Sequence, residues 1–116
     1  MEIRYIDTRG NTQEPLTFSE ALLKGIASGG GLFVPEKLPS MTLDEIVSLA
    51  SMPYAERAAF VYERFGVDFD DTELNELMQR AYNENFDTPD ICPVVTVADG
   101  MHVLELWHGP TCAFKD

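Results

Sequence analysis

The sequence predicts a mixed α+β or α/β fold, in which a small amino-terminal domain of short helices is followed by a β-hairpin. In the first two thirds of the chain, apolar residues recur three and four positions apart behind capping signals, which is typical of amphipathic helices. From Pro93 onward, β-branched and apolar residues flank an Asp-Gly pair, which indicates two strands joined by a tight turn. With 116 residues and 45% hydrophobic content, the chain is long enough for one modest core.

The chain is expected to open with a short half-buried strand over residues 2–6, where polar and apolar side chains alternate, followed by a turn over residues 7–11. A first helix should follow this turn. Thr17 and Glu20 have capping-box spacing, and apolar residues behind them recur at helical intervals as far as Ile26.

The glycine run at residues 29–31 is expected to end the first helix and to lead into a brief extended segment over residues 32–34. Pro35 should end that segment, and Pro39 keeps the next connection stiff. The backbone amides of a glycine run can also cradle a phosphate. However, neither G-x-G-x-x-G after a strand nor G-x-x-x-x-G-K-[ST] is present, so we interpret the run as a tight connection.

Three further helices are predicted in the middle third. Thr42 repeats the capping-box spacing, and Pro53 suits the first turn of the next helix, which Gly66 should end. The last helix should start at Asp70 or Asp71, because either carboxylate can accept unpaired amide protons. Its apolar face contains Leu74, Leu77, Met78, Ala81 and Tyr82. Its acidic face is expected to be solvated and contains Glu73, Glu76, Glu84 and Asp87.

The hairpin is expected to pair residues 93–97 with residues 101–106 across Asp99 and Gly100. β-Branched residues on the incoming side support the strand assignment. An Asp-Gly pair favours a two-residue type I′ turn, because both central positions of that turn need a positive φ.

The charge balance disfavours two classes of partner. Twenty acidic against eight basic side chains give a net charge of −12, which repels the phosphates of nucleic acids and anionic membrane surfaces. The sequence shows neither a signal peptide nor an apolar run of membrane-spanning length, so we expect a cytoplasmic protein. Cys92 and Cys112 lack C-x-x-C spacing and are expected to be reduced thiols.

Lys115 is the strongest functional lead, because it follows a Gly-Pro turn at residues 109–110, where a strand is expected to give way to a helix near Thr111. A lysine amine has an ordinary pKa of about 10.4 and is almost all ammonium at neutral pH. Removal of water by Ala113 and Phe114, or the positive end of a helix, would favour the neutral, nucleophilic amine. This pattern predicts a covalent attachment point for a cofactor.

Residues 105–116, E-L-W-H-G-P-T-C-A-F-K-D, resemble the threonine synthase signature E-L-F-H-G-P-T-x-A-F-K-D, whose lysine carries pyridoxal 5′-phosphate. Residues 8–10, 18–27 and 30–36 are similar to the amino-terminal segment of that family in the same order. The resemblance therefore spans essentially the whole chain. The departures from the family's pattern are all compatible with packing and lie at Trp107, Cys112 and Ser28-Gly29.

The resemblance implies a fold-type-II pyridoxal-phosphate enzyme that converts O-phospho-L-homoserine and water to L-threonine and phosphate through a Schiff base on Lys115. Residues 1–92 would form the amino-terminal domain. Residues 93–116 would be the hairpin and lysine-bearing start of a cofactor-binding domain that continues beyond Asp116. A glycine-rich loop for the cofactor phosphate is expected in that remainder, so these 116 residues alone should be inactive.

The resemblance also implies roles for single residues. Lys115 is the expected catalytic and cofactor-binding residue, with Phe114 beside it, and His108 and Thr111 are candidate contacts for the substrate or its phosphate. Two alternatives stay open, namely that the His108 ring holds the Gly-Pro turn and that Thr111 caps the helix. Asp116 is expected to favour the helix dipole and not to take part in catalysis. No metal is expected, because His108 and the nearby cysteine lack further ligands at suitable spacing.

Two other functions also stay open. A non-enzymatic interaction module would use the exposed apolar edge after Leu106 to bind a partner, and Lys115 would then be incidental. A related fold-type-II lyase would act on another phosphorylated amino acid. Chemical trapping of the cofactor on Lys115 separates the first alternative from an enzyme, and product identification separates the second from threonine synthesis.

Overall fold

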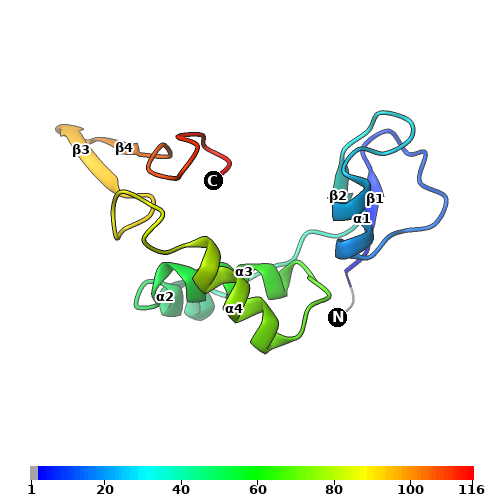
Figure 1. The fold of residues 1–116 in the computed structure, drawn as a ribbon, viewed down its shortest axis with the longest axis horizontal. Helices are drawn as coiled ribbons and strands as arrows, with labels where there is room; N and C mark the ends of the chain where they lie inside the picture. Colours follow the sequence, from blue (N-terminus) through cyan, green and yellow to red (C-terminus); the bar gives the residue numbers. More distant parts are fainter. Residues whose placement is uncertain (1–2) are drawn as a thin grey trace.

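The computed structural model describes residues 3–116, which contain four helices and two antiparallel sheets of two strands each (Figure 1). The mixed α+β class predicted from the sequence is confirmed. In chain order the elements are β1 (Tyr5–Asp7), α1 (Phe18–Lys24), β2 (Phe33–Pro35), α2 (Leu43–Leu49), α3 (Tyr54–Arg64), α4 (Asp71–Ala81), β3 (Val94–Ala98) and β4 (Met101–Leu104). The molecule is elongated. Its radius of gyration is 16.5 Å, whereas a compact domain of this size has a radius of gyration of about 13 Å.

β1, β2 and α1 form a small unit at one end of the molecule (Figure 1). β1 pairs antiparallel with β2, so that Tyr5 lies opposite Pro35. The core of this unit consists of Ile3, Tyr5 and Ala21, with Leu16, Phe18 and Phe33 packed against them. Of the strand predicted over residues 2–6, Glu2 lies outside the described residues. The strand begins only at Tyr5, so Ile3 and Arg4 precede it, and it continues to Asp7, which was expected in the turn.

The turn after β1 is organised by the carboxylate of Asp7, which is 3% exposed. This carboxylate accepts hydrogen bonds from the Thr12 hydroxyl at 2.5 Å and from the Arg9 N–H at 2.8 Å. The bond from Thr12 is the main reason why the pKa of Asp7 is lowered. In the glycine run, the Gly30 N–H donates to the Ala27 carbonyl at 2.7 Å. The run is therefore the tight connection that the sequence predicts.

α1 begins behind the predicted capping box, in which the Glu20 N–H donates to Thr17 Oγ1 at 3.2 Å and the Thr17 N–H donates to Glu20 Oε2 at 2.9 Å. The helix ends at Gly25, before the glycine run that was expected to stop it. Gly25 has a φ of +69°, and a right-handed helix cannot continue through that conformation. Ile26 consequently leaves the helix and forms a β-bridge with Leu32.

α2 carries the second capping box, between Thr42 and Glu45, and none of its residues is buried. Glu45 also forms an ion pair with Arg64 of α3. α3 begins directly after Pro53, so this proline occupies the N-cap position and not the first turn as predicted. No helix among residues 3–116 combines the length and the apolar character needed to cross a membrane.

α3 and α4 pack against each other around a second small core, which consists of Ala55, Ala59, Leu74 and Met78. α4 begins at Asp71, and Asp70 is its N-cap, because the Asp70 carboxylate accepts the Glu73 N–H at 2.9 Å. The small alanines of α3 leave room for the larger side chains of α4, so the two helices can approach closely. The predicted apolar face of α4 is therefore confirmed at Leu74 and Met78.

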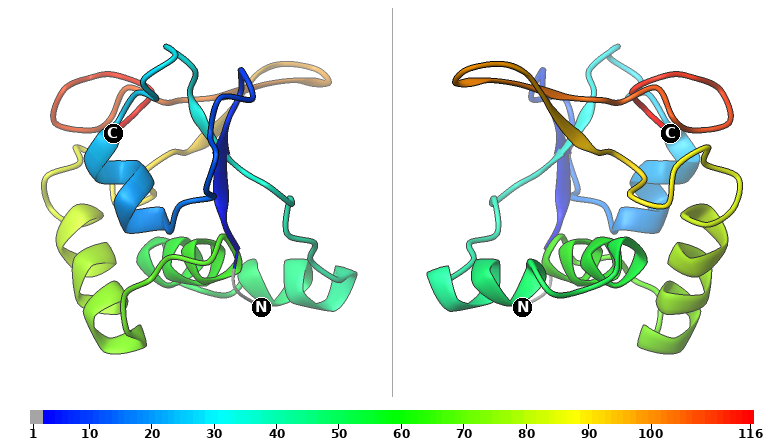
Figure 2. Two further views of the ribbon diagram at one scale, coloured as in Figure 1. Left: turned by 90° about the vertical axis from the view of Figure 1, so that its right-hand side faces the viewer. Right: turned by 90° about the vertical axis from the view of Figure 1, so that its left-hand side faces the viewer.

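The first unit joins the helical layer at the end of α3, and β1 starts near this point and runs away from it (Figure 2). The Tyr5 hydroxyl donates to the Phe65 carbonyl at 2.7 Å, across sixty positions of sequence. Gly66 ends α3 in a Schellman motif with a φ of +67°. A Cβ atom at Gly66 would lie 2.8 Å from the Cβ of Ile3. The absence of a side chain at Gly66 therefore lets the start of the chain approach the helix end.

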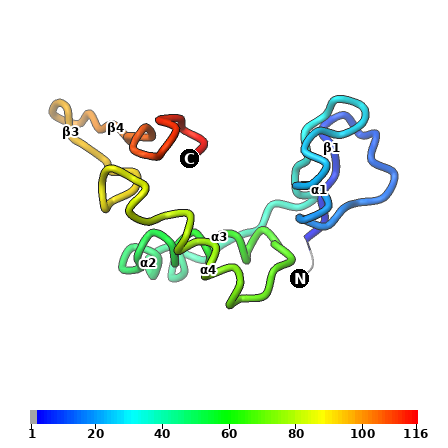
Figure 3. Tube along the Cα trace, viewed as in Figure 1, coloured from blue at the N-terminus to red at the C-terminus, as the bar shows by residue number. Residues whose placement is uncertain are grey.

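β3 and β4 form the predicted hairpin at the other end of the molecule, after which the chain turns back (Figures 1 and 3). The predicted type I′ turn is wrong, because Gly100 has a positive φ of 68° but Asp99 does not. The register shifts between Thr96 and Ala98, so a bulge accompanies the turn. β4 ends at Leu104, two residues earlier than expected.

We expect Gly66→Ala to destabilise the intact protein by about 2 to 4 kcal/mol, because alanine would adopt an unfavourable φ and its Cβ would also meet Ile3. Gly10→Ala is the control, since Gly10 has a similar φ of +70°, but apart from its neighbours in the chain no heavy atom lies within 4 Å of the place that a Cβ would take there. The control should lose only about 1 to 2 kcal/mol. Urea unfolding of both variants measures the difference, and equal losses would show that contact with Ile3 contributes nothing.

Candidate functional site

Residues 105–116 form a loop that follows β4. The Glu105 N–H donates to the Pro93 carbonyl at 2.9 Å and continues the pairing of the hairpin by one residue. The helix expected near Thr111 is not formed, and residues 109–116 make turns instead. Cys112 has a φ of +57°, which interrupts a right-handed helix. Within residues 3–116 the lysine therefore lies in a turn and not in a helix.

The carboxylate of Asp116 closes this loop. It accepts hydrogen bonds from the Thr111 N–H at 2.9 Å, from the Thr111 hydroxyl, and from the Ala113 N–H at 3.4 Å. A Cβ atom at Gly109 would lie 2.4 Å from the Cβ of Asp116, so the carboxylate can occupy this place only beside a glycine. Within the described residues Thr111 caps no helix, and the carboxylate of Asp116 accepts its hydrogen bonds from this loop. The hydrogen bond from the Thr111 side chain is the main reason why the pKa of Asp116 is lowered.

Lys115 is exposed on this loop, with its Nζ 5.7 Å from the centre of the Phe114 ring. Phe114 is itself 72% exposed, and Ala113 is exposed as well. The removal of water that was expected from these two neighbours is therefore not provided by them. Among residues 3–116, no carboxylate lies within ion-pair distance of the Lys115 amine. The loop presents a primary amine that is accessible to a ligand.

His108 lies between two carboxylates, and only 15% of its side chain is exposed. Its Nε2 is 2.6 Å from Glu105 Oε2, and its Nδ1 is within hydrogen-bond distance of Asp87 Oδ1. The Asp87 N–H also donates to the His108 carbonyl at 3.0 Å. The hydrogen bond to Glu105, followed by the one to Asp87, raises the pKa of His108.

The part played by Asp87 could not be found from the sequence. It was assigned to a solvated face of the last helix, but it lies beyond the end of α4, and its side chain contacts His108 although 70% of it is exposed. Asp87 and His108 are 21 positions apart, so no local spacing signals the pair. Glu105 stands three positions before His108, and this spacing is the one local signal that was available.

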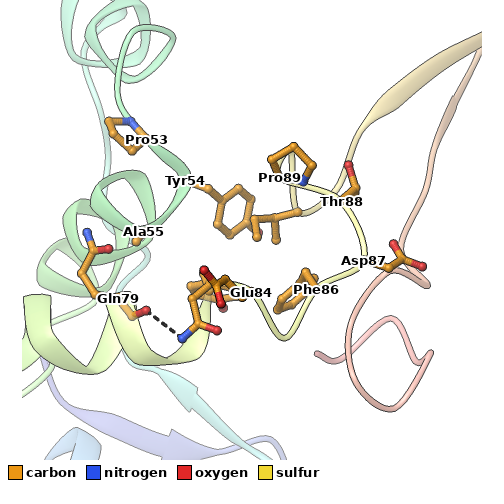
Figure 4. A pocket seen from close by; sticks show the side chains of 12 residues that line it. Pro53, Tyr54, Ala55, Gln79, Glu84, Phe86, Asp87, Thr88 and Pro89 are labelled. Carbon is orange, nitrogen blue, oxygen red and sulfur yellow. Dashed lines mark hydrogen bonds between the residues drawn. The ribbon is translucent and has the colours of Figure 1, made fainter.

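A cavity of about 570 Å³ lies behind Asp87, between α3, the end of α4 and the loop that follows α4 (Figure 4). Tyr54 points into it from α3, whereas Asp87 points away from it (Figure 4). Tyr54 stacks edge-on with Tyr82 at 4.8 Å between ring centres, and Tyr82 lies 5.9 Å from Phe86. Burial, and then a hydrogen bond with Cys92, raise the pKa of Tyr54 to about 12. The tyrosine is therefore neutral at physiological pH, and the cluster supports the loop that carries Asp87.

The site residues predicted from the sequence thus fall into two groups, those bonded to carboxylates and those exposed to solvent. His108 and Thr111 are engaged by carboxylates, whereas Lys115 and Phe114 face solvent. In the part of the chain that the structure describes, no group of three or more histidine, cysteine, aspartate or glutamate side chains could hold a metal ion. The arrangement can present one amine on a loop that is braced by hydrogen bonds on both sides of it.

Comparisons with known proteins agree on one family. A family model described as the threonine synthase N terminus matches residues 4–82. The chain is 42% identical to the threonine synthase of Pseudomonas aeruginosa over 98% of this chain and 24% of that protein. It is 44% identical to human threonine synthase-like 1 over 85% of this chain and 14% of that protein.

Solved structures give the same result. A crystal structure of threonine synthase from Brucella melitensis with pyridoxal phosphate bound superposes with a TM-score of 0.87 at 36% identity, over 98% of this chain and 24% of that one. Threonine synthase from yeast superposes with a TM-score of 0.81 at 30% identity, over 98% and 23% of the two chains. The chain therefore spans about a quarter of the length of the threonine synthases it matches.

We expect Asp116→Ala to loosen the loop of residues 105–116, here called the lysine loop, in the intact protein. The Thr111 amide should then exchange its hydrogen about tenfold faster. Asp116→Asn keeps one acceptor oxygen and should show a smaller increase. The pKa of Asp116 is lowered in the folded state, so its contribution is complete above the ordinary value of 3.8 and is lost as the pH falls through the lowered value. Exchange rates followed by NMR test both points, and an unchanged Thr111 rate in the alanine variant would contradict the proposed closure.

Proposed function

Because the chain belongs to the threonine synthase family, we propose that it is the amino-terminal part of an enzyme that converts O-phospho-L-homoserine and water to L-threonine and phosphate. The observation that carries this proposal is the accessible amine of Lys115, on a braced loop with the family's signature sequence. The match to a relative with pyridoxal phosphate bound, over 98% of this chain, supports the choice of cofactor.

The described residues fit one side of such a cofactor. Lys115 supplies a primary amine without a carboxylate partner among residues 3–116, and an amine is what an aldehyde cofactor needs for attachment. The loop does not supply a phosphate grip, because the backbone N–H groups of Thr111 and Ala113 already donate to Asp116. We therefore propose that the groups that hold the cofactor phosphate lie outside these 116 residues.

We assign two roles to Lys115. Its Nζ would hold the cofactor, and the same nitrogen, once free, would accept and return protons at the substrate carbons. When bound, pyridoxal phosphate supplies an aldehyde for attachment and a ring that takes up electron density. Phe114 would contact the cofactor beside the lysine. Since neither Phe114 nor Ala113 covers the amine, the exclusion of water must come from segments that pack over this loop.

His108 and Thr111 would contact a substrate only after releasing the carboxylates to which they are now hydrogen-bonded. The Thr111 hydroxyl donates to Asp116, so it must release that carboxylate before it can donate to a substrate phosphate. Both ring nitrogens of His108 face carboxylates, and the same condition applies to them. We therefore propose that the main role of these two residues is to hold the loop in shape, and that a contact with the substrate requires these hydrogen bonds to break.

We also propose that residues 1–92 and 93–116 belong to two domains and that the chain alone does not turn over substrate. Within residues 93–116 only Gly109 is buried, so the hairpin and loop have no core of their own. Exposed apolar side chains on both sides of this boundary include Leu22, Leu23, Leu43, Val47, Val94 and Met101. We propose that the remainder of a chain as long as its relatives covers these surfaces. A cytoplasmic location stays a prediction.

We expect pyridoxal phosphate to attach to Lys115 in the intact protein, since this amine is accessible on the signature loop. The protein is incubated with the cofactor, reduced with borohydride and digested, and the labelled peptide is mapped by mass spectrometry. Lys115→Ala should lose the label. Lys24→Ala and Lys37→Ala, which replace the two other lysines of this sequence, should keep it.

Label at another lysine, or none, would contradict the assignment and favour a non-enzymatic interaction module. Release of phosphate from O-phospho-L-homoserine, with L-threonine as the product, tests the reaction separately. Another product from another phosphorylated amino acid would identify a related lyase.

A further inference from the structure

We propose that His108 is a positioning residue that acts as an imidazolium and ties the lysine loop to the segment after α4. The tie itself follows from the geometry of His108, Asp87 and Glu105. Only the statement that it positions Lys115 for chemistry rests on the function proposed above.

The hydrogen-bond partners require this protonation state. An ionised carboxylate can only accept hydrogen bonds, and a neutral imidazole has one N–H donor. The Nδ1 of His108 faces Asp87, and its Nε2 lies 2.6 Å from Glu105. Both contacts are hydrogen bonds at once only when both nitrogens carry hydrogen. With a neutral ring, one carboxylate would face a nitrogen lone pair, which is repulsive.

The tie lies where it can control the placement of the loop. The hairpin and the loop after it comprise residues 94–116, and Pro93 connects them to the rest of the chain. Among the described residues, hydrogen bonds between His108 and Asp87 join residues 94–116 to residues 3–92. One of them connects the side chains, and the other runs from the Asp87 N–H to the His108 carbonyl at 3.0 Å. Two bonds between the same residues restrict rotation as well as distance. His108 stands directly before the turn at residues 109–110 and seven positions before Lys115.

The surroundings of the ring favour its charge. In the part of the chain described, the charged groups that face it are Asp87, from the loop after α4, and Glu105, from the segment after β4, and both are acidic. The neighbouring Trp107 ring, 5.5 Å away between centres, carries no charge. Because the pKa of His108 is raised, the contribution of its side-chain bonds is complete below the ordinary value of 6.5 and is lost as the pH rises through the raised value.

The first test is an NMR titration of the intact protein labelled with ¹⁵N-histidine. Both ring nitrogens of His108 should show imidazolium shifts at neutral pH, and His108 should lose its proton only above the ordinary pKa of 6.5. His102 is the control position for the second test, because its Nδ1 lies 3.0 Å from the Thr96 hydroxyl, and a hydroxyl can either donate or accept. A neutral His108 ring at pH 7 would overturn the proposal.

The second test compares His108→Gln with His102→Gln in the intact protein. An amide side chain cannot donate to both carboxylates in the same way, so labelling of Lys115 by pyridoxal phosphate and borohydride should become about tenfold to a hundredfold slower in H108Q. The H102Q control should label at the wild-type rate. The wild-type rate should also fall as His108 loses its proton, and H108Q should lack this pH dependence.

The outcomes separate the two proposals. If the wild-type protein does not label at Lys115 although the His108 ring is still protonated at pH 7, the proposed function fails and the tie stands. If H108Q labels at the wild-type rate and with the wild-type pH dependence, the positioning role fails and the function stands. Should H108Q not fold, Asp87→Asn removes one charge and should lower the pH at which His108 titrates in the first test; an unchanged titration in D87N would overturn the tie.

Discussion

Tyr5 donates its hydroxyl hydrogen to the carbonyl of Phe65 at the place where Gly66 lets Ile3 approach the backbone. The arrangement of the whole chain depends on this junction, because the two cores on either side of it are small. Neither the sheet with α1 nor the pair of α3 and α4 buries enough apolar surface to be a domain of ordinary size. A second contact nearby, from the Ser19 N–H and hydroxyl to the Asp68 carboxylate at 2.9 and 2.7 Å, adds to the same junction.

The candidate site follows a different physical rule, since it lies on a loop without a core. Its shape comes from carboxylates that accept hydrogen bonds from the loop. Asp116 closes the loop around the Thr111 backbone, and Asp87 holds His108 from outside the loop. Lys115 stays exposed between these two braces, so the described residues provide an amine and its placement. They do not provide the dry surroundings that a lysine nucleophile needs.

Residues with local partners were predicted well from the sequence. Both capping boxes, the N-cap at Asp70 and the glycine end of α3 are present, because each of them is decided by residues at most five positions apart. Local spacing failed where two signals competed. Gly25 ended α1 before the glycine run could, and the bulge next to Ala98 replaced the expected type I′ turn.

The sequence by itself determined the helices, the hairpin and, through its resemblance to a family signature, the lysine on which a function can be proposed. Only the tertiary structure decided that Asp87 reaches His108 and that Tyr5 meets the end of α3. The physical reason is the range of the interactions. A capping bond forms within one turn of backbone, whereas a contact across 21 or 60 positions forms only when packing has brought the two segments together.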